Sequence, residues 1–313
     1  MNKSTVSIIM PFYNEQESFK YFNDKIINPI HNCNNIRFEL ILVDDGSTDN
    51  SIEFLKKINF EGVKCKIVKL AKNYGSHSAV YAGILSSAGD FVTILSSDFQ
   101  DNFEIVLRMH RKAVTGYDII FPLRQNSAQP ILVRLFSRFY SSLLRRFAIK
   151  DYPRKNFDIF FINKKVKEAI LKTYEPNSSI LLHIFNLGFK KGYIEYDRVE
   201  RIAGKSKWTF AKKLKFLIDS FIGFSYFPIR LVTIMGITFF IFGITWTLFI
   251  FFRKIYFNDL LIGWPALTSI LLLGFGVTNI SLGIIAEYLW RTFDVSRNKQ
   301  IFLIDEIINL NND

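Results

Sequence analysis

Two long runs without a charged side chain constrain the fold of this 313-residue chain more than any other feature. The first run, Leu231–Phe252, has 22 residues and the second, Leu260–Ala286, has 27. An α-helix rises about 1.5 Å per residue, so each run can cross a hydrocarbon core about 30 Å thick. A buried core helix is the alternative, but two such runs separated only by RKIYFND are hard to house in one soluble domain. We therefore expect a two-helix transmembrane hairpin over residues 229–288, with spans at about 231–252 and 260–286.

Basic side chains at the outer ends of the two runs predict how this hairpin is oriented. The connecting segment offers only Arg253 and Lys254 against Asp259. The outer flanks are far more basic and carry Lys205, Lys207, Lys212, Lys213, Lys215, Arg230, Arg291, Arg297 and Lys299. Loops rich in Lys and Arg stay in the cytosol. We expect a multi-pass protein of the cell membrane whose N-terminal domain and both termini are cytosolic.

The segment before the first run has the pattern of an amphipathic helix. Trp208, Leu214 and Phe221 fall on one helical face, and Lys212 and Lys215 fall on the opposite face. A core helix is the commoner meaning of such a stripe, but the basic face and the adjacent apolar run favour a helix at the membrane surface. The expected organisation is a catalytic domain over 1–204, a juxtamembrane helix over 205–228, the hairpin over 229–288 and a cytosolic tail over 289–313.

The net charge of +12 raises nucleic acid as a partner, but no nucleic-acid motif accompanies it. Much of the clustered charge flanks the apolar runs, so an anionic lipid bilayer is the simpler partner. Cys33 and Cys65 define neither a metal site nor a disulfide framework and fit a reducing compartment. No apolar signal-peptide core precedes Val6. We expect contact with a bilayer and none with nucleic acid.

Four short apolar runs alternate with helical patterns in the first part of the chain. They are Val6–Met10, Phe38–Val43, Lys64–Leu70 and Phe91–Leu95. The last run shows no polar alternation, as expected of a strand buried on both faces. Strands that alternate with helices at this spacing predict an α/β fold with a doubly wound, mostly parallel sheet.

Three of these runs end in acidic or polar side chains, and the carboxyl ends of parallel strands share one edge, where open α/β sheets place ligands. After the last run, the carboxylates of Asp98 and Asp101 suit Mg²⁺ or Mn²⁺ bridging a diphosphate. A polar turn with Asp101 or Asn102 as a helix N-cap is the alternative. The other residues at this edge are Asn14, Glu15, Asp44 and Asp45. Either aspartate of the last pair can accept a hydrogen bond from a base or a ribose.

Several ligand classes are excluded by missing motifs. The glycine fingerprint of dinucleotide folds is absent, and Gly204-Lys205-Ser206 imitates a P-loop although Val199 stands where its first glycine belongs. The DDGSTDN segment misses the spacing of a calcium-binding EF-hand. The chain is therefore not expected to be a dehydrogenase, a P-loop ATPase or a calcium sensor.

Five segments in order resemble the successive motifs of glycosyltransferase family 2. They are SIIMPFYNEQES, ELILVDDGSTDNS, KNYGSHSAVYAGI, GDFVTILSSDFQD and PRKNFDIFFINKKV. The resemblance is to membrane-anchored polyprenyl-phosphate glycosyltransferases, relatives of dolichol-phosphate mannose synthases, and it covers nearly the whole chain. It implies a GT-A fold and inverting transfer of one hexose from a nucleotide sugar, UDP-glucose by default, to a polyprenyl phosphate such as undecaprenyl phosphate. It also implies Mg²⁺ or Mn²⁺ and a homo-oligomer, a tetramer by analogy.

The resemblance also implies a set of site residues in this numbering. Asp98 and Asp101 are the expected metal ligands, and Asp98, Asp158 and Arg124 are the expected catalytic residues. The expected donor-binding residues are Pro11, Tyr13, Asn14, Glu15, Asp44, Asp45, Asn73, His77, Ser97, Arg198 and Arg201. A structural role is the alternative for His77, and a basic membrane-proximal linker is the alternative for the last two arginines.

The acceptor is expected to meet arginines rather than a general base. A lipid phosphate is already anionic near neutral pH, so it needs positioning and not deprotonation. Guanidinium groups suit that task. The residues that match the acceptor-phosphate region are Arg124, Arg134, Arg138 and Gln100. A basic amphipathic helix lying on headgroups is the alternative for the arginines.

Two positions depart from the family's pattern. Ser96 replaces the first aspartate of the usual Asp-x-Asp pair, so one metal ligand is expected to be missing. Phe160 replaces the basic residue that usually follows Asp158. An acid inside an apolar run costs free energy unless it is paired, which favours a role for Asp158 at the sugar or the metal.

Two other functions are considered. A polysaccharide synthase of the same family predicts a Gln-x-x-Arg-Trp signature and more apolar spans, and the sequence contains neither. A membrane scaffold that has lost activity is suggested by Ser96. We favour the enzyme because Asp98, Gln100, Asp101 and Asp158 are all retained.

Overall fold

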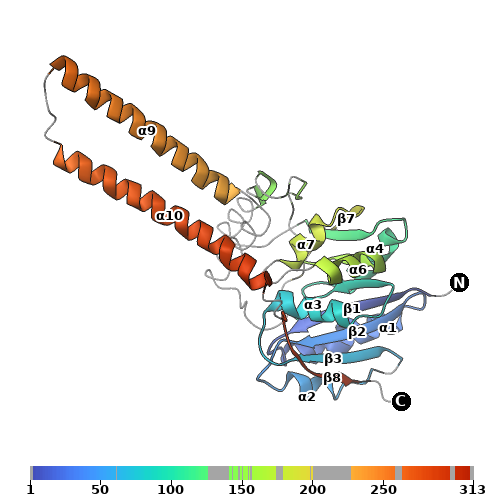
Figure 1. The fold of residues 1–313 in the computed structure, drawn as a ribbon. Helices are drawn as coiled ribbons and strands as arrows, with labels where there is room; N and C mark the ends of the chain where they lie inside the picture. Colours follow the sequence, from blue (N-terminus) through green and yellow to red (C-terminus); the bar gives the residue numbers. More distant parts are fainter. Residues whose placement is uncertain are drawn as a thin grey trace.

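The structure is a computed structural model (Figure 1). It describes residues 3–60, 62–125, 141–142, 144–146, 149, 151–153, 155, 157–173, 179–197, 199, 227–257, 263–296 and 300–310. The structural statements that follow concern these residues. The expected amphipathic helix falls almost wholly on residues 205–226, outside the described part, so it stays a prediction.

The described chain builds an eight-stranded mixed sheet in the order β7-β5-β6-β4-β1-β2-β3-β8. Its strands are β1 (Thr5–Phe12), β2 (Arg37–Asp44), β3 (Lys64–Leu70), β4 (Phe91–Ile94), β5 (Ile119–Arg124), β6 (Phe161–Asn163), β7 (Lys191–Tyr196) and β8 (Ile304–Asn309). The four central strands, β4, β1, β2 and β3, run parallel, as the alternation of strands and helices predicts. The α/β expectation is confirmed, and all four expected strands are present.

The sheet is less uniformly parallel than expected. β6 pairs antiparallel with both β4 and β5, and β8 pairs antiparallel with β3. Beyond β6, β5 and β7 again run parallel. β8 has no counterpart in the sequence-based expectation, which placed residues 289–313 in a tail.

Both faces of the sheet are covered, because the strands are apolar on both sides. Ile8 packs in the core on one face and Ile9 in the core on the other, and neither is exposed. The first core includes α4 (Glu104–Ala113) and the helical segment 18–31. The second core includes α3 (Ser76–Ser86), α6 (Lys164–Thr173) and α7 (Ile180–Asn186). Figure 1 shows the sheet between these helices.

The helical segment after β1 is broken into three pieces. A 3₁₀ turn, η1 (Ser18–Tyr21), leads into the π-helical η2 (Asn23–Ile27) and the short α1 (Asn28–His31). Pro29 cannot donate a backbone hydrogen bond, and its ring clashes with the preceding turn. A π-helical turn just before such a residue relieves that clash. The short α2 (Ser51–Leu55) follows β2.

Two long helices, α9 (Phe227–Phe257) and α10 (Trp264–Ser296), contact each other and project away from the sheet (Figure 1). α9 contains the whole first uncharged run, and α10 contains residues 264–286 of the second run. Within the described residues, no helix qualifies as a membrane span by length and apolar character together. The expected transmembrane hairpin therefore stays a prediction.

After α10 the chain returns to the sheet as β8, on the edge beside β3 (Figure 1). The Lys69 ammonium lies 2.7 Å from an Asp305 carboxylate oxygen, and Ala71 N donates to Leu303 O at 3.0 Å. A sheet edge without a partner exposes a row of backbone donors and acceptors. β8 satisfies that row on β3, which leads into the loop containing Asn73.

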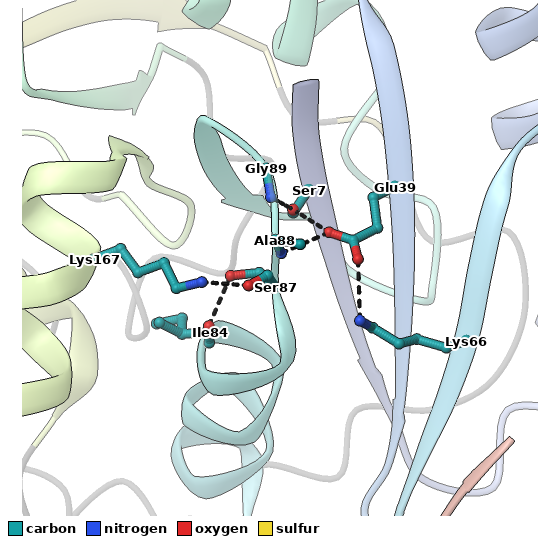
Figure 2. A network of polar contacts seen from close by, with 8 residues as sticks. All are labelled: Ser7, Glu39, Lys66, Ile84, Ser87, Ala88, Gly89 and Lys167. Atoms are coloured by element: carbon teal, nitrogen blue, oxygen red, sulfur yellow. Dashed lines mark hydrogen bonds and ion pairs between the residues drawn. The ribbon is translucent and has the colours of Figure 1, made fainter. Parts of the chain in front are cut away.

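A buried carboxylate ties the amino-terminal ends of three strands together (Figure 2). Glu39 on β2 accepts the Ser7 hydroxyl at 2.5 Å and Ala88 N at 2.9 Å, and Lys66 lies 3.0 Å from its other oxygen. Burial alone raises the pKa of Glu39, but these donors outweigh burial and hold the pKa below its usual range. The network fixes the turn before β4, far along each strand from the acidic edge.

Gly89 is required at this turn. A Cβ atom there would lie 2.7 Å from Ser7 Oγ and 2.8 Å from Thr5 O, closer than van der Waals contact allows. On the other side of the turn, the Lys167 ammonium donates to the Ser87 carbonyl oxygen (Figure 2). β4 therefore starts from a fixed point, and its carboxyl end is positioned accordingly.

Candidate functional site

Hydrogen bonds from Asn14 join the loop after β1 to the loop after β2. Its side-chain oxygen accepts the Thr48 backbone N–H at 2.8 Å and the Asp49 N–H at 3.3 Å, while Asn14 N donates to Ser47 Oγ at 2.9 Å. Asn14 adopts a left-handed backbone with φ of 51°, which asparagine tolerates better than most residues. Asn14 thus joins the loops after β1 and β2 through direct hydrogen bonds.

The residues next to Asn14 add further contacts at the same place. Glu15 N donates to Ser51 Oγ at 3.0 Å, and the Glu15 carboxylate accepts the Ser18 hydroxyl at 2.9 Å. Pro11 pairs with Val43 in the parallel ladder, and Tyr13 lies half-buried at the start of the loop. The expected donor-binding segment 11–15 therefore lies at the carboxyl edge of the sheet, as the strand pattern predicts.

Asp45 holds the loop that follows β3. Its two carboxylate oxygens accept Tyr74 N at 2.7 Å and Gly75 N at 2.9 Å. Burial raises the pKa of Asp45 to about 6, against the lowering effect of these two bonds. Next to it, Gly46 has φ of 75°, and a Cβ there would lie 2.5 Å from the Lys72 carbonyl carbon. The loop carrying exposed Asn73, which leads into α3 with half-buried His77, is thus fixed against β2.

Asp44 differs from Asp45 because one of its buried carboxylate oxygens accepts no hydrogen bond from the described residues. One oxygen accepts Ser47 N at 2.9 Å, and the other, Oδ2, finds no hydrogen-bond partner among the described residues. Asp44 is 0% exposed, and burial raises its pKa. A buried carboxylate oxygen without a donor costs free energy. Of the two expected donor-binding aspartates, Asp44 is therefore the one prepared for an N–H or O–H of a ligand.

The segment after β4 brings Asp98 and Asp101 into the interior at the same edge of the sheet. Both are 5% exposed, and Asp98 accepts Gln100 N at 3.3 Å. Between them Phe99 has φ of 53°, a strained value for an aromatic residue. Its ring packs edge-on against Phe22 at 6.1 Å, which holds the turn in place. Ser97, also buried, precedes this turn.

Asp101 is not a helix cap. Its Oδ2 accepts the Ser96 hydroxyl at 2.7 Å, and its Oδ1 accepts the Tyr196 hydroxyl at 3.1 Å. At the start of α4 it is Asn102 whose side-chain oxygen accepts the Glu104 N–H, at 3.2 Å. Phe103 is the N-cap residue of α4 and no side-chain bond caps the helix, so neither Asp101 nor Asn102 occupies the cap position.

The side chains at this edge provide only some of the ligands that a hard divalent cation needs. Across the described residues, no group of three or more His, Cys, Asp or Glu side chains is placed to hold a metal ion. Asp98 and Asp101 contribute the two buried carboxylates in the segment after β4. Mg²⁺ and Mn²⁺ commonly take one or two carboxylates and complete their shell with phosphate oxygens and water. The residues therefore fit a metal that arrives with a diphosphate.

Arg124 and Asp158 form an ion pair across the sheet edge. Arg124 ends β5 and its side chain is 10% exposed, whereas the Asp158 side chain is 46% exposed. Phe160, at the position where the family usually has a basic residue, is fully buried in the core. Arg124 therefore places a positive charge beside Asp158 although position 160 is Phe, and two of the three expected catalytic residues lie together.

Beside this pair lies a polar cluster that the sequence did not reveal. Glu195 on β7 accepts from Gln125 at 2.7 Å and pairs with Lys155, which holds the pKa of Glu195 below its usual range. Arg108 donates to the Glu195 carbonyl oxygen at 2.6 Å. Just beyond, Val199 N donates to Gln100 O at 3.0 Å. No motif marks these contacts because each joins residues far apart in sequence.

Four expected site residues lie outside the described part of the chain. They are Arg134, Arg138, Arg198 and Arg201. Their roles stay predictions. The remaining expected residues gather at the carboxyl edge, contributed by β1, β2, β3, β4, β5 and the segments that follow them.

Acidic side chains at the carboxyl edge of an α/β sheet are typical of enzymes that bind phosphorylated ligands. Residues 7–173 match the family model of glycosyl transferase family 2. The match spans more than half of the chain, so the chain belongs to this family and is a glycosyltransferase. The resemblance drawn from the five motifs is confirmed.

Characterised and uncharacterised relatives align over nearly the full length. An uncharacterised glycosyltransferase, YkcC of Bacillus subtilis (strain 168), is 27% identical over 311 residues, covering 98% of this chain and 95% of the relative. The undecaprenyl-phosphate 4-deoxy-4-formamido-L-arabinose transferase of Proteus mirabilis (strain HI4320) is 26% identical over 313 residues, covering 97% and 94%. Similarity to a polyprenyl-phosphate glycosyltransferase therefore includes the region of α9, α10 and β8.

Among solved structures, glucosyl-3-phosphoglycerate synthase from Mycobacterium tuberculosis, in complex with Mn²⁺, UDP and glucosyl-3-phosphoglycerate, is similar with a TM-score of 0.48. The two chains are 17% identical, and the match covers 64% of this chain and 73% of that one. The likeness is partial and concerns the fold alone.

Proposed function

We propose that the protein transfers a single hexose from a nucleotide sugar to a polyprenyl phosphate, giving a lipid-phosphate-linked sugar. UDP-glucose is the proposed donor and undecaprenyl phosphate the proposed acceptor. The observation that carries the proposal is the carboxyl edge of the sheet, where Asp44 keeps a buried acceptor near the buried acids Asp98 and Asp101. Support for the lipid acceptor comes from the arabinose transferase relative.

In this proposal the nucleotide lies over the loops after β1 and β2. The buried oxygen of Asp44 accepts an N–H of the base or a ribose hydroxyl, and burial makes that bond stronger than it is in water. Asn14 and Asp45 hold the surrounding loops through the bonds given above. They preorganise the donor site and leave recognition to Asp44.

Asp98 and Asp101 would hold Mg²⁺ or Mn²⁺ in a GT-A fold. When bound, such a cation neutralises charge on the leaving diphosphate. Asp98 contributes the carboxylate nearest the end of β4, and Asp101 is held by Ser96 and Tyr196. The two acids supply negative charge that neutral neighbours cannot replace.

The proposed acceptor phosphate lies near Arg124. This guanidinium is mostly buried and paired with Asp158, so its orientation is fixed. Arg124 would position the anionic phosphate for attack on the sugar carbon with inversion, and no general base is required. Asp158 would hold Arg124 and contact the sugar.

We further propose that α9 and α10 form a membrane hairpin at the cytosolic face of the cell membrane, in a homo-oligomer that is tetrameric by family resemblance. Support comes from large apolar side chains that these helices expose, such as Ile234 at 63%, Phe275 at 66% and Leu289 at 63%. Exposed apolar surface on this scale marks an interaction with lipid or protein. A reporter active only outside the cytosol, fused after Asp313, is expected to stay silent, and an active reporter contradicts this topology.

The transfer reaction is tested with the full-length protein in detergent. Undecaprenyl phosphate, Mn²⁺ and a panel of nucleotide sugars are supplied, and lipid-extractable product is measured. The expected result is a singly glycosylated lipid phosphate with one donor of the panel. A water-soluble polymer would instead support the polysaccharide synthase, and no product with any donor would support the scaffold.

A further inference from the structure

The strongest unexplained feature is the pair of hydroxyl groups on Asp101. The Ser96 hydroxyl donates to one carboxylate oxygen at 2.7 Å and the Tyr196 hydroxyl donates to the other at 3.1 Å. Asp101 and Tyr196 are each 5% exposed, so the bond between them is buried, whereas the bond from Ser96 is partly buried. Bonds to an ionised group in such surroundings are stronger than bonds between neutral groups.

The two donors come from distant parts of the fold. Ser96 follows β4, in the middle of the sheet, whereas Tyr196 ends β7 at the far side of β6 and β5. A second bond joins the same parts, because Val199 N donates to Gln100 O at 3.0 Å. The chain leaving β7 is therefore attached to the acidic segment by a side chain and by the backbone.

The bonds leave the carboxylate able to hold a cation. An ionised carboxylate has about four lone-pair sites, and two hydroxyl donors use one on each oxygen. The two hydroxyl groups restrict the rotation of the Asp101 carboxylate without using all of its lone-pair sites. A carboxylate held in one orientation loses less conformational freedom when it becomes a ligand.

We propose that Tyr196 and Ser96 are positioning residues for the metal ligand Asp101, and that β7 is thereby part of the metal site. The proposal rests on the proposed metal-dependent function. Ser96, which replaces the usual first aspartate, then has a defined task. A carboxylate at position 96 would face Asp101 as a like charge, whereas the serine hydroxyl donates to it.

The test is calorimetric titration of Mn²⁺ into the full-length protein in the presence of saturating UDP or GDP. Tyr196→Phe removes only the hydroxyl and keeps the buried ring, and Ser96→Ala removes the second donor. Each is expected to weaken Mn²⁺ binding about five- to tenfold, because the metal must then order a carboxylate that one of its two hydroxyl partners no longer holds. Nucleotide affinity without metal is expected to be unchanged. Ser96→Thr keeps the hydroxyl and is expected to restore Mn²⁺ binding to within about twofold of wild type.

Tyr193→Phe is the matched control, because Tyr193 lies on the same strand and is 40% exposed. Its Mn²⁺ affinity is expected to equal that of the wild type. If the wild type takes up Mn²⁺ with nucleotide and Tyr196→Phe does so equally well, the positioning role is wrong while the proposed function stands. If the wild type takes up no Mn²⁺ with either nucleotide, the positioning role is also overturned, and the product assay decides the function separately.

Discussion

Arg124 at the end of β5 and Asp158 just before β6 form an ion pair, although 33 residues separate them in the sequence. The pair explains how an acid is tolerated beside the buried residues Phe157 and Ile159. It also provides Asp158 with a basic partner from the neighbouring strand β5, although position 160 is Phe. The pairing links a residue expected at the sugar to one expected at the acceptor phosphate.

The first prediction concerns the acceptor. Arg124→Ala is expected to raise the KM for polyprenyl phosphate by about tenfold or more, because one buried, charge-assisted phosphate contact is lost. Donor affinity is expected to change by less than about threefold, since Arg124 lies away from Asp44. Initial rates at varied lipid and fixed donor measure this. A collapse of donor affinity with an unchanged KM for the lipid contradicts the assignment.

A second variant distinguishes positioning from phosphate binding at this pair. Asp158→Asn keeps the shape of the side chain but leaves the Arg124 guanidinium without its anionic partner. We expect a lower kcat with a smaller change in the KM for lipid, because the arginine charge is retained. Equal effects of both substitutions on the KM for lipid would show that the pair acts only as a structural unit.

The second prediction concerns the pH dependence of stability. It rests on two buried acids whose pKa values are shifted in opposite directions. The pKa of Glu39 is lowered from its ordinary value of 4.5, so its stabilising effect is present above that value and is lost as the pH falls through its folded pKa. The pKa of Asp45 is raised from 3.8 to about 6, so between these values the folded state binds more protons than the unfolded state. Its contribution to stability therefore falls as the pH rises through that window.

Two substitutions separate these contributions. When the pH falls below about 4.5, the apparent melting temperature of Glu39→Gln is expected to decrease less than that of the wild type. Asp45→Asn is expected to remove a fall in melting temperature between about pH 4 and pH 6. Each variant is the control for the other, and the slope against pH is the readout. Parallel curves for all three proteins contradict the assigned shifts.

The third prediction concerns β8. A chain that ends after Ser296 loses the strand that pairs with β3, together with the Lys69–Asp305 ion pair. We expect a lower apparent melting temperature and weaker nucleotide binding, because β3 leads into the loop held by Asp45. Removal of residues 311–313 alone is the control and is expected to have no effect. Unchanged nucleotide binding by the shorter chain would show that β8 only covers an edge.

The central strands could be predicted from the sequence because their signals are local. Lys64–Leu70 was expected from its apolar residues and flanking turns, and β3 has those bounds. β8 could not be predicted in the same way. Its sequence, IDEIIN, has charged residues among the apolar ones, and its pairing with β3 is made across more than 200 residues.

The candidate site was predictable in its location and less so in its detail. The acids at strand ends indicated the carboxyl edge, but the sequence could not distinguish Asp44 from Asp45. Only the fold shows that both carboxylate oxygens of Asp45 accept backbone N–H groups, whereas one oxygen of Asp44 accepts none from the described residues. Ser96 was expected only to mark a missing metal ligand, and its bond to Asp101 was not foreseen because the orientation of Asp101 depends on tertiary structure.

The most direct test compares the rate of lipid-linked product formation for wild type, Ser96→Ala and Asp98→Asn, with the optimal donor, undecaprenyl phosphate and Mn²⁺. Asp98 supplies one of the two negative charges of the proposed metal site, whereas Ser96 supplies one hydrogen bond to Asp101. The account predicts no measurable transfer by Asp98→Asn and a loss within about tenfold, or about 1.4 kcal/mol, for Ser96→Ala. An Asp98→Asn protein that glycosylates the lipid at the wild-type rate would contradict the account.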